Sequence, residues 1–279
     1  MSDYVCLFTI CRNEQSFLDE FIKYYFAIGV DKIVFIDNNV DNEQNKIINK
    51  YENIIYVKDS FSLNGKSLPL HKKYGSLVYE KFFWTLFFDR DEIINLGEFS
   101  NIKELLMLHE EHNLLSLNWK CFASKKEINK NLITNLTDRL VVNPQHKIFN
   151  HCKSIVRTKD SDFLFSNPHY PSNFTDSFNL TTKKVITVTA QNNLDSDEYY
   201  KNPSLHHYHY HGLQNFIRKI DKPDKEIRKI ENLLDKYNSY DKLFEAAYDE
   251  QYKSELMMQD DSIIKFLKRE NLYDKIYSE

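Results

Sequence analysis

The sequence predicts an α/β fold in which a mixed, mostly parallel sheet is flanked by helices and followed by a helical C-terminal extension. Two observations predict it. Short apolar runs alternate with amphipathic helical patterns over roughly the first 100 residues, an order typical of a parallel sheet. From residue 211 onward, nearly every segment has helical periodicity. A chain of 279 residues is long enough for one large domain with an appendage, and we expect a main domain at 1–219 and the extension at 220–279.

The elements of the first half follow from their apolar spacing. Buried strands are expected at residues 5–10, 32–36, 54–57 and 84–88. Helices are expected between them at residues 15–28, 41–51 and 72–81, and Gly29 ends the first.

The second half has a different pattern. A helix is expected at residues 102–109, and strands at 114–119, 153–157 and 184–190. Helices are then expected at residues 213–220, 226–237, 241–256 and 262–267.

Composition excludes several classes of protein. The net charge of −4 gives no electrostatic basis for binding nucleic acid or an anionic membrane. The four cysteines have neither metal-site nor disulfide-framework spacing. The N-terminal apolar run ends at Arg12, too soon for a signal peptide or a transmembrane segment. We therefore expect a cytoplasmic protein without a transmembrane segment.

Polar clusters follow three of the expected strands. In open parallel sheets, ligands bind beyond the carboxyl ends of the strands, so these clusters are the first indication of a site. The clusters are Arg12-Asn13-Glu14, Asp37-Asn38-Asn39 and Asp89-Arg90-Asp91-Glu92.

Asp89 and Asp91 are the candidate metal ligands. Side chains two residues apart on an extended chain point the same way, so both carboxylates would face one ligand while Arg90 faces elsewhere. Two converging carboxylates repel each other unless a cation lies between them. Their oxygen atoms favour Mn²⁺ or Mg²⁺ over Zn²⁺.

Histidines are concentrated at residues 206–211, where the sequence is HHYHYH. In an extended segment His207, His209 and His211 share one face. One neutral imidazole is a suitable additional ligand for Mn²⁺, which accepts nitrogen more readily than Mg²⁺ does. An exposed polar strand with adventitious metal affinity is the alternative interpretation. Trp119, which ends an expected strand, is equally suited to the core and to a sugar-binding platform.

Several ordered motifs resemble the glycosyltransferase family 2-like and family 92-like group. The motifs are CRNE at residues 11–14, FLDEF at 17–21, GVDK at 29–32, WTLFFDRDE at 84–92, KSIVR at 153–157, HYP at 169–171, and HY at 207–208 with Phe216 and Lys219. Together they extend from residue 5 to about residue 219. The resemblance implies a GT-A fold, which is Rossmann-like, and a metal-dependent transfer of a hexose from a nucleotide-sugar.

The resemblance also implies roles for individual residues. Asp91 and His207 would bind the metal, and Asp89 would contact both the metal and the ribose. The remaining positions would contact the nucleotide, its phosphates or the acceptor; they are Arg12, Asn13, Glu14, Asp37, Lys153 and His169. The donor is expected to be UDP-linked, and the acceptor a glycan, a lipid-linked glycan or a protein.

The group is expected to invert the anomeric centre, which requires a carboxylate base beside the acceptor hydroxyl. Asp138, Asp176 and Glu92 are the candidates. A nucleotidyltransferase is an alternative on the same fold, although CRNE lacks the glycine-rich loop that such enzymes usually carry. A non-catalytic module that binds sugar or metal is a third possibility. The mixed-charge C-terminal helices could form an oligomer surface or, more simply, a solvated face.

Overall fold

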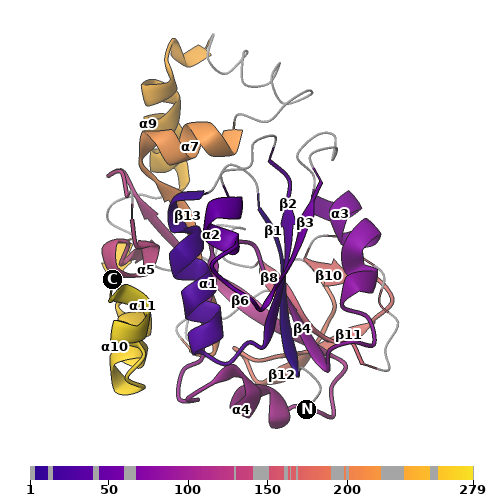
Figure 1. Cartoon of the computed structure of the whole chain (residues 1–279). Coiled ribbons are helices and arrows are strands. Elements are labelled where there is room, and N and C mark those ends of the chain that lie inside the picture. Colours follow the sequence, from indigo (N-terminus) through magenta and orange to yellow (C-terminus); the bar gives the residue numbers. More distant parts are fainter. Residues whose placement is uncertain are drawn as a thin grey trace.

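The computed structural model confirms the mixed α/β fold, with a curled sheet flanked by helices (Figure 1). It describes residues 4–11, 15–39, 44–59, 67–128, 130–140, 151–159, 163, 165–167, 169–189, 198, 201–220, 236–251 and 257–278. Within these residues, no helix is both long and apolar enough to cross a membrane.

The N-terminal half forms the parallel part of the sheet, in the order β4-β1-β2-β3. The strands are β1 (Val5–Cys11), β2 (Lys32–Asp37), β3 (Ile54–Lys58) and β4 (Trp84–Phe87). The central strands β1, β2 and β4 are almost entirely buried, because helices cover both faces. Each of these strands is therefore a continuous apolar run in the sequence, without the alternation of polar and apolar residues that marks a half-exposed strand.

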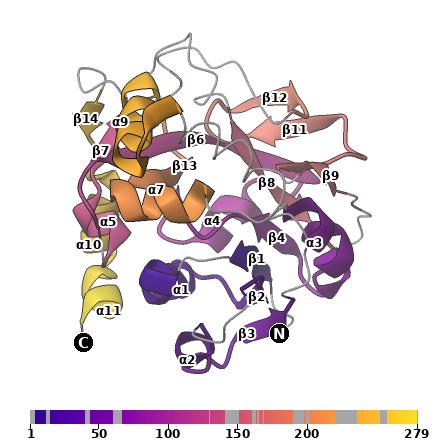
Figure 2. The same cartoon turned by 90° about the horizontal axis from the view of Figure 1, so that it is seen from above.

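Helices cover this half on both faces. They are α1 (Leu18–Ala27), α2 (Asn45–Ile48) and α3 (Ser67–Tyr74). Figure 2 shows α1 and α2 on one face of the sheet and α3 on the other. The helix expected at residues 72–81 begins earlier than its apolar spacing indicated, and a 3-10 turn, Gly75–Leu77, follows it.

The second half is a mixed sheet organised by one long strand, β6 (Leu114–Ser124), all of which is buried. The first part of β6 pairs with β8 (Cys152–Arg157) and β11 (Asp176–Asn179), and its last part with β13 (Ser204–His211) and β7 (Asp138–Leu140). β8 lies antiparallel between β4 and β6 and so joins the two halves. The remaining strands are β5 (Glu92–Asn95), β9 (Phe165–Asn167), β10 (Tyr170–Pro171), β12 (Lys184–Thr187) and β14 (Met257–Gln259).

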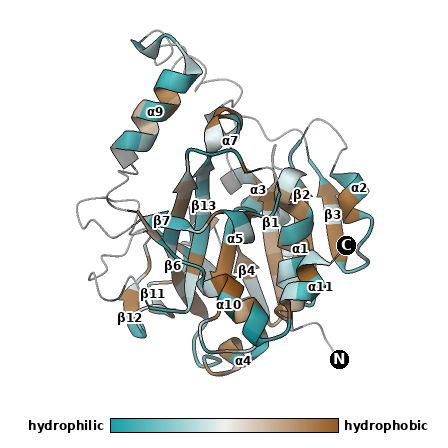
Figure 3. Ribbon diagram, turned by 90° about the vertical axis from the view of Figure 1, so that its left-hand side faces the viewer, coloured by the Kyte–Doolittle hydropathy of each residue, from teal (hydrophilic) through white to brown (hydrophobic). Residues whose placement is uncertain are grey.

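The strands differ in the hydropathy of their residues. In Figure 3, β1 and β3 are mainly hydrophobic, whereas β13 is hydrophilic along most of its length. Nevertheless, most of β13 is buried, from Ser204 to Tyr208 and again at His211. A buried strand rich in histidine needs polar partners, so β13 is a candidate for function rather than for the core alone.

The helices beyond β5 are α4 (Ile102–Met107), α5 (Leu132–Asn135), α7 (Gly212–Ile220), α9 (Tyr240–Gln251), α10 (Ser262–Arg269) and α11 (Tyr273–Tyr277). Two C-terminal helices, α10 and α11, pack onto helices that precede them in the sequence. α10 and α11 lie beside α1 (Figure 1), where the Tyr277 hydroxyl donates to Glu20 at 2.7 Å. α9 packs on α7 through Phe244 and Phe216. Most of the helix expected at 226–237 lies outside the described residues.

Candidate functional site

The polar residues that follow β2 and β4 lie at one edge of the sheet, as expected. β1 pairs in parallel with both strands, and Cys11 at its end is in register with Asp37. Asp89 follows β4 at the same edge. The third expected cluster, Arg12 to Glu14, lies outside the described residues.

Residues 89–92 form a tight turn, so the expectation that Asp89 and Asp91 lie on an extended chain is wrong. The Glu92 amide donates to the Asp89 carbonyl at 3.0 Å, and the Asp89 amide donates to the Glu92 carboxylate at 2.7 Å. Arg90 is buried, and its guanidinium lies over the Phe17 ring at 5.6 Å. A turn, rather than strand alternation, therefore sets the positions of Asp89, Arg90 and Asp91.

Lys153 links the turn to β8. Its ammonium group lies 2.5 Å from Asp89 Oδ2 and 3.6 Å from Glu92 Oε2. Only 1% of the Lys153 side chain is exposed, against 41% of Asp89. Burial opposes the charge on Lys153, but the two carboxylates raise its pKa. Burial likewise works against the charge on Asp89, yet Lys153 lowers the pKa of that carboxyl.

Glu92 differs from its neighbours because it is completely buried. Burial raises its pKa well above the usual value, and the positive charge of Lys153 offsets this only in part. Its Oε1 atom has no hydrogen-bond partner among the described residues. Burial therefore favours the protonated form of Glu92 over the charged form.

Asp91 faces β13. His207 Nε2 lies 3.5 Å from Asp91 Oδ2, and each residue is 7% exposed. The Tyr208 amide donates to the Asp91 carbonyl at 2.8 Å, which fixes the strand against the turn. His207 is in register with Glu92 on β5 and with Cys121 on β6. The structure thus brings together two predicted site residues that are more than 100 positions apart in the sequence.

The Trp119 ring packs against three imidazole rings. Its ring centroid lies 4.1 Å from that of His207, 4.9 Å from His151 and 5.4 Å from His169. The His169 Nδ1 atom is 2.9 Å from the Cys152 carbonyl. Burial, with the nearby Lys153 charge, lowers the pKa of His169 to about 4, so this ring is neutral at neutral pH. Because Trp119 is only 9% exposed, it packs against these rings and does not form an open platform for a sugar.

The other β13 histidines have separate environments. His206 lies 3.4 Å from the Asn95 amide nitrogen and stacks on Phe122, and burial lowers its pKa to about 3. The His209 ring stacks on Tyr210 with centroids 3.9 Å apart, and His211 contacts Phe17 edge-on. His207 faces Asp91, with its Nε2 atom 3.5 Å from Oδ2.

Asp37 is fully buried, and its carboxylate is already engaged. Oδ1 accepts from the backbone and side-chain nitrogens of Asn39 at 2.9 and 2.7 Å. Oδ2 accepts from the Tyr56 hydroxyl at 2.7 Å and from the Lys58 ammonium group at 2.9 Å. These bonds shape the loop after β2, and contact between Asp37 and a nucleoside stays a prediction.

Two of the three candidate bases, Asp138 and Asp176, lie away from this cluster. Asp138 is on β7, which β6 separates from β13, and Gln259 donates to it. Asp176 lines a cleft with His112 near the start of β6, whereas His207 pairs near its end. The structure does not bring either residue to Asp91.

Sequence reasoning missed several residues of the site. The His71 ring packs on Phe8 and Phe87, and its charge acts on Asp89. His151 stacks on Trp119, and Asp59, after β3, accepts from Lys73 and Tyr74. Asp59 follows a strand, which is the signal that indicated the other clusters. His71 and His151 lie in segments with no motif.

Asp91 and His207 have the chemistry of ligands for a divalent cation. A separation of 3.5 Å between Asp91 and His207 suits two ligands of one ion, and His207 Nδ1 has no hydrogen-bond partner among the described residues. Asp89 already forms an ion pair with Lys153, so its partly exposed carboxylate would have to bind the cation and Lys153 at the same time. Among the described residues, Asp89, Asp91 and His207 do not form a trio of ligand atoms within 4.8 Å of one another. The chemistry fits a cation centred on Asp91 and His207.

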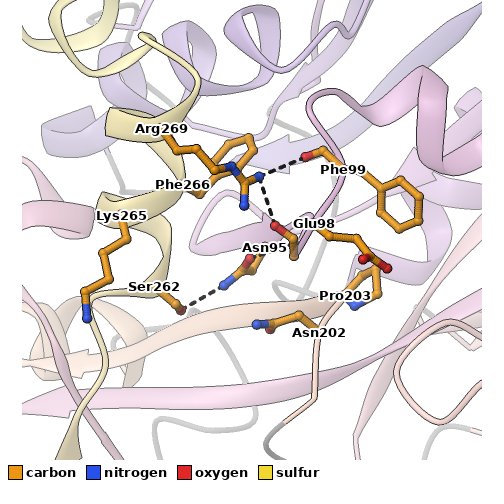
Figure 4. A pocket seen from close by; sticks show the side chains of 10 residues that line it. Asn95, Glu98, Phe99, Asn202, Pro203, Ser262, Lys265, Phe266 and Arg269 are labelled. Atoms are coloured by element: carbon orange, nitrogen blue, oxygen red, sulfur yellow. Dashed lines mark hydrogen bonds between the residues drawn. The ribbon is translucent and has the colours of Figure 1, made fainter.

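A separate cavity of about 470 Å³ lies at the other end of β5 (Figure 4). Asn95, which donates to Ser262 at 2.8 Å, lies on its wall. Arg269 closes another side by donating to the Gly97 carbonyl at 3.1 Å. None of the predicted site residues lines this cavity.

Comparisons with known proteins give no family assignment. No protein-family model matches the sequence, and no curated protein matches it. Among solved structures, residues 1–349 of TarS from S. aureus are 16% identical, with a TM-score of 0.38, over 81% of this chain and 68% of that chain. The 4-diphosphocytidyl-2C-methyl-D-erythritol synthase from Anaerococcus prevotii is 12% identical, with a TM-score of 0.32, over 60% of this chain and 79% of that chain. Both TM-scores lie below 0.5, so neither similarity assigns an activity.

Proposed function

We propose that this chain is a GT-A-type glycosyltransferase that transfers a hexose from a nucleotide-sugar, expected to be UDP-linked, to a hydroxyl acceptor. The observation that carries the proposal is the approach of His207 to Asp91 at the carboxyl edge of the parallel strands. That edge is where open sheets bind nucleotides. The motif resemblance independently pairs these two positions as metal ligands. Residues 1–219 would form the catalytic part, with 220–279 as an extension.

Asp91 and His207 would hold the divalent cation, with Asp89 as an additional ligand. A bound Mn²⁺ or Mg²⁺ would supply positive charge to the leaving diphosphate, an effect typically worth several kcal/mol. The Trp119 ring keeps His207 in its orientation through a contact between centroids 4.1 Å apart. Since an orienting partner of a metal ligand strongly affects affinity, Trp119 is a positioning residue in this proposal.

The resemblance implies that Lys153 faces the phosphates or the acceptor, and its geometry adds a second role. Because it is 1% exposed and bonded to Asp89, it fixes the position and charge of that carboxylate. We assign the acceptor-side base to none of the clustered carboxylates. Glu92 is completely buried, so its carboxylate is not open to an acceptor hydroxyl. Asp138 and Asp176 lie away from Asp91, so their role as the base of an inverting mechanism stays a prediction from the sequence alone.

The test is donor binding followed by turnover. A panel of nucleotide-sugars is screened by thermal unfolding with and without Mn²⁺. Donor present at 100 times its Kd should add about 2.7 kcal/mol to the free energy of unfolding. Asp91→Asn should abolish the Mn²⁺-dependent part of this shift, whereas Asp241→Asn, at an exposed position, is the matched control.

The products separate the proposal from its alternative. Release of nucleoside diphosphate together with sugar transfer supports a glycosyltransferase. Release of pyrophosphate from a nucleoside triphosphate and a sugar phosphate would show a nucleotidyltransferase instead. Asp91→Asn protein that turns over donor at the wild-type rate would overturn the metal assignment.

A further inference from the structure

Two histidines and a glutamate come together in the turn after α4, away from the carboxylate cluster. The His112 amide donates to the His109 carbonyl at 3.1 Å, which closes the turn. A turn of this kind brings the first and fourth side chains close together. One ligand atom from each of His109, Glu111 and His112 lies within 4.8 Å of the others. Of the described residues, only these form such a group of three.

Both imidazole rings rest on Phe178 of β11. The His112 ring is stacked on it, with centroids 4.6 Å apart and planes 11° apart, and the His109 centroid lies at 4.8 Å. Glu110 is held elsewhere, because Tyr4 donates to its carboxylate at 2.5 Å and Arg157 to its carbonyl at 2.9 Å. Packing thus orients two nitrogen ligands and leaves Glu111 as the adjacent carboxylate.

We propose that His109, Glu111 and His112 bind a transition-metal ion of the Zn²⁺ class. Two imidazoles and one carboxylate are a common protein ligand set for Zn²⁺. His112 Nε2 lies 3.3 Å from Glu111 Oε1. Bonds of about 2.0–2.1 Å in a tetrahedron place neighbouring ligands roughly 3.3–3.4 Å apart, which this separation matches. The Glu111 side chain is 65% exposed, so adjusting it to a bound ion costs little.

The site borders a cleft of about 280 Å³, lined in part by Glu111, His112 and Asp176. Three protein ligands leave the fourth tetrahedral position open beside this cleft. The site is separate from the proposed catalytic cation. It precedes Leu114 at the start of β6, whereas His207 pairs with Cys121, roughly 20 Å further along the strand.

The test is Zn²⁺ binding to the full chain by calorimetry, in an Asp91→Asn/His207→Phe background that removes the proposed catalytic ligands. We expect one tight site in this background. His109→Ala should weaken it at least 10-fold, and Glu111→Gln should weaken it less. His112→Phe should also remove Zn²⁺ binding. Because this variant keeps an aromatic ring stacked on Phe178, the loss of binding cannot be ascribed to unfolding.

Two controls complete the experiment. His209→Ala removes a histidine from the β13 run, and Glu98→Gln removes a carboxylate at an exposed position; neither should change Zn²⁺ affinity. Co²⁺ is the spectroscopic probe, and an intense visible absorption typical of tetrahedral coordination is expected. The proposal is overturned if His109→Ala and His112→Phe bind Zn²⁺ as tightly as their parent, or if Co²⁺ gives only the weak octahedral spectrum.

Discussion

Replacing His207 tests the proposed site most directly, because its ring makes two contacts that can be removed separately. One is with the Asp91 carboxylate and the other is with the Trp119 ring. The ring lies 3.5 Å from Asp91 and packs against Trp119 with centroids 4.1 Å apart. Loss of a residue that merely supports a metal ligand typically costs 10–100-fold in affinity, so loss of the ligand itself should cost at least that. In free energy this is about 1.4–2.7 kcal/mol of Mn²⁺ binding.

Packing must be distinguished from ligation. His207→Ala leaves a hole beside Trp119 in a position that is 7% exposed, and should also lower the free energy of unfolding by about 1–3 kcal/mol. His207→Phe keeps a ring against Trp119 but has no ligand atom, so it should lose Mn²⁺ affinity with a smaller loss of stability. His209→Ala, two positions along the strand, should keep both.

The assay is Mn²⁺ titration in the presence of UDP, with thermal unfolding of each variant as the measure of stability. A His207→Phe variant with wild-type Mn²⁺ affinity would refute the ligand assignment. Equal small losses in His207→Phe and His209→Ala would show that the histidine run has only general affinity for metals.

Three further predictions follow from buried charges and from the unassigned base. Lys153→Met should lower the free energy of unfolding, measured by chemical denaturation, by about 2–4 kcal/mol. This is the low end for a buried ion pair, because the Asp89 side chain is 41% exposed. Burial raises the pKa of Glu20 to about 7, so folded protein holds a proton that unfolded protein has lost. Stability should therefore fall by about 1–3 kcal/mol as the pH rises from about 4.5 to about 7. Glu20→Gln should flatten that profile; an unchanged slope in denaturation at several pH values would contradict it. If Asp138 or Asp176 is the base, its Asn variant should lower kcat and leave donor binding intact, and wild-type kcat in both would eliminate both.

The sequence predicted the parallel strands well for a physical reason. β1, β2 and β4 are buried on both faces, so their residues are apolar without interruption. β14 is only three residues long and is defined by its antiparallel pairing with β7. Its sequence is too short to show a hydropathy pattern that would predict a strand. The polar residues at the ends of β2 and β4 meet at one edge because parallel strands bring their carboxyl ends together.

Side-chain geometry at the site could not be read from the sequence in the same way. Spacing placed Asp89 and Asp91 on one face of a strand, but the chain turns there, and each carboxylate has its own partner. Those partners come from β8 and β13, whose positions depend on pairings with strands far away in the sequence. The burial of Glu92 follows from the same pairings, since β13 covers it.

The charges brought together at this edge give a reason for a cation. Asp89, Asp91 and Glu92 lie around the single ammonium group of Lys153, which acts on all three. Burial favours a proton on Glu92, Lys153 is paired with Asp89, and Asp91 faces His207. A nucleoside diphosphate approaching Asp91 would meet another negative group, and like charges at contact distance cost free energy unless a cation lies between them. In the proposed function, His207 would keep such a cation beside Asp91 without adding negative charge, because a neutral imidazole can bind a metal ion through its nitrogen.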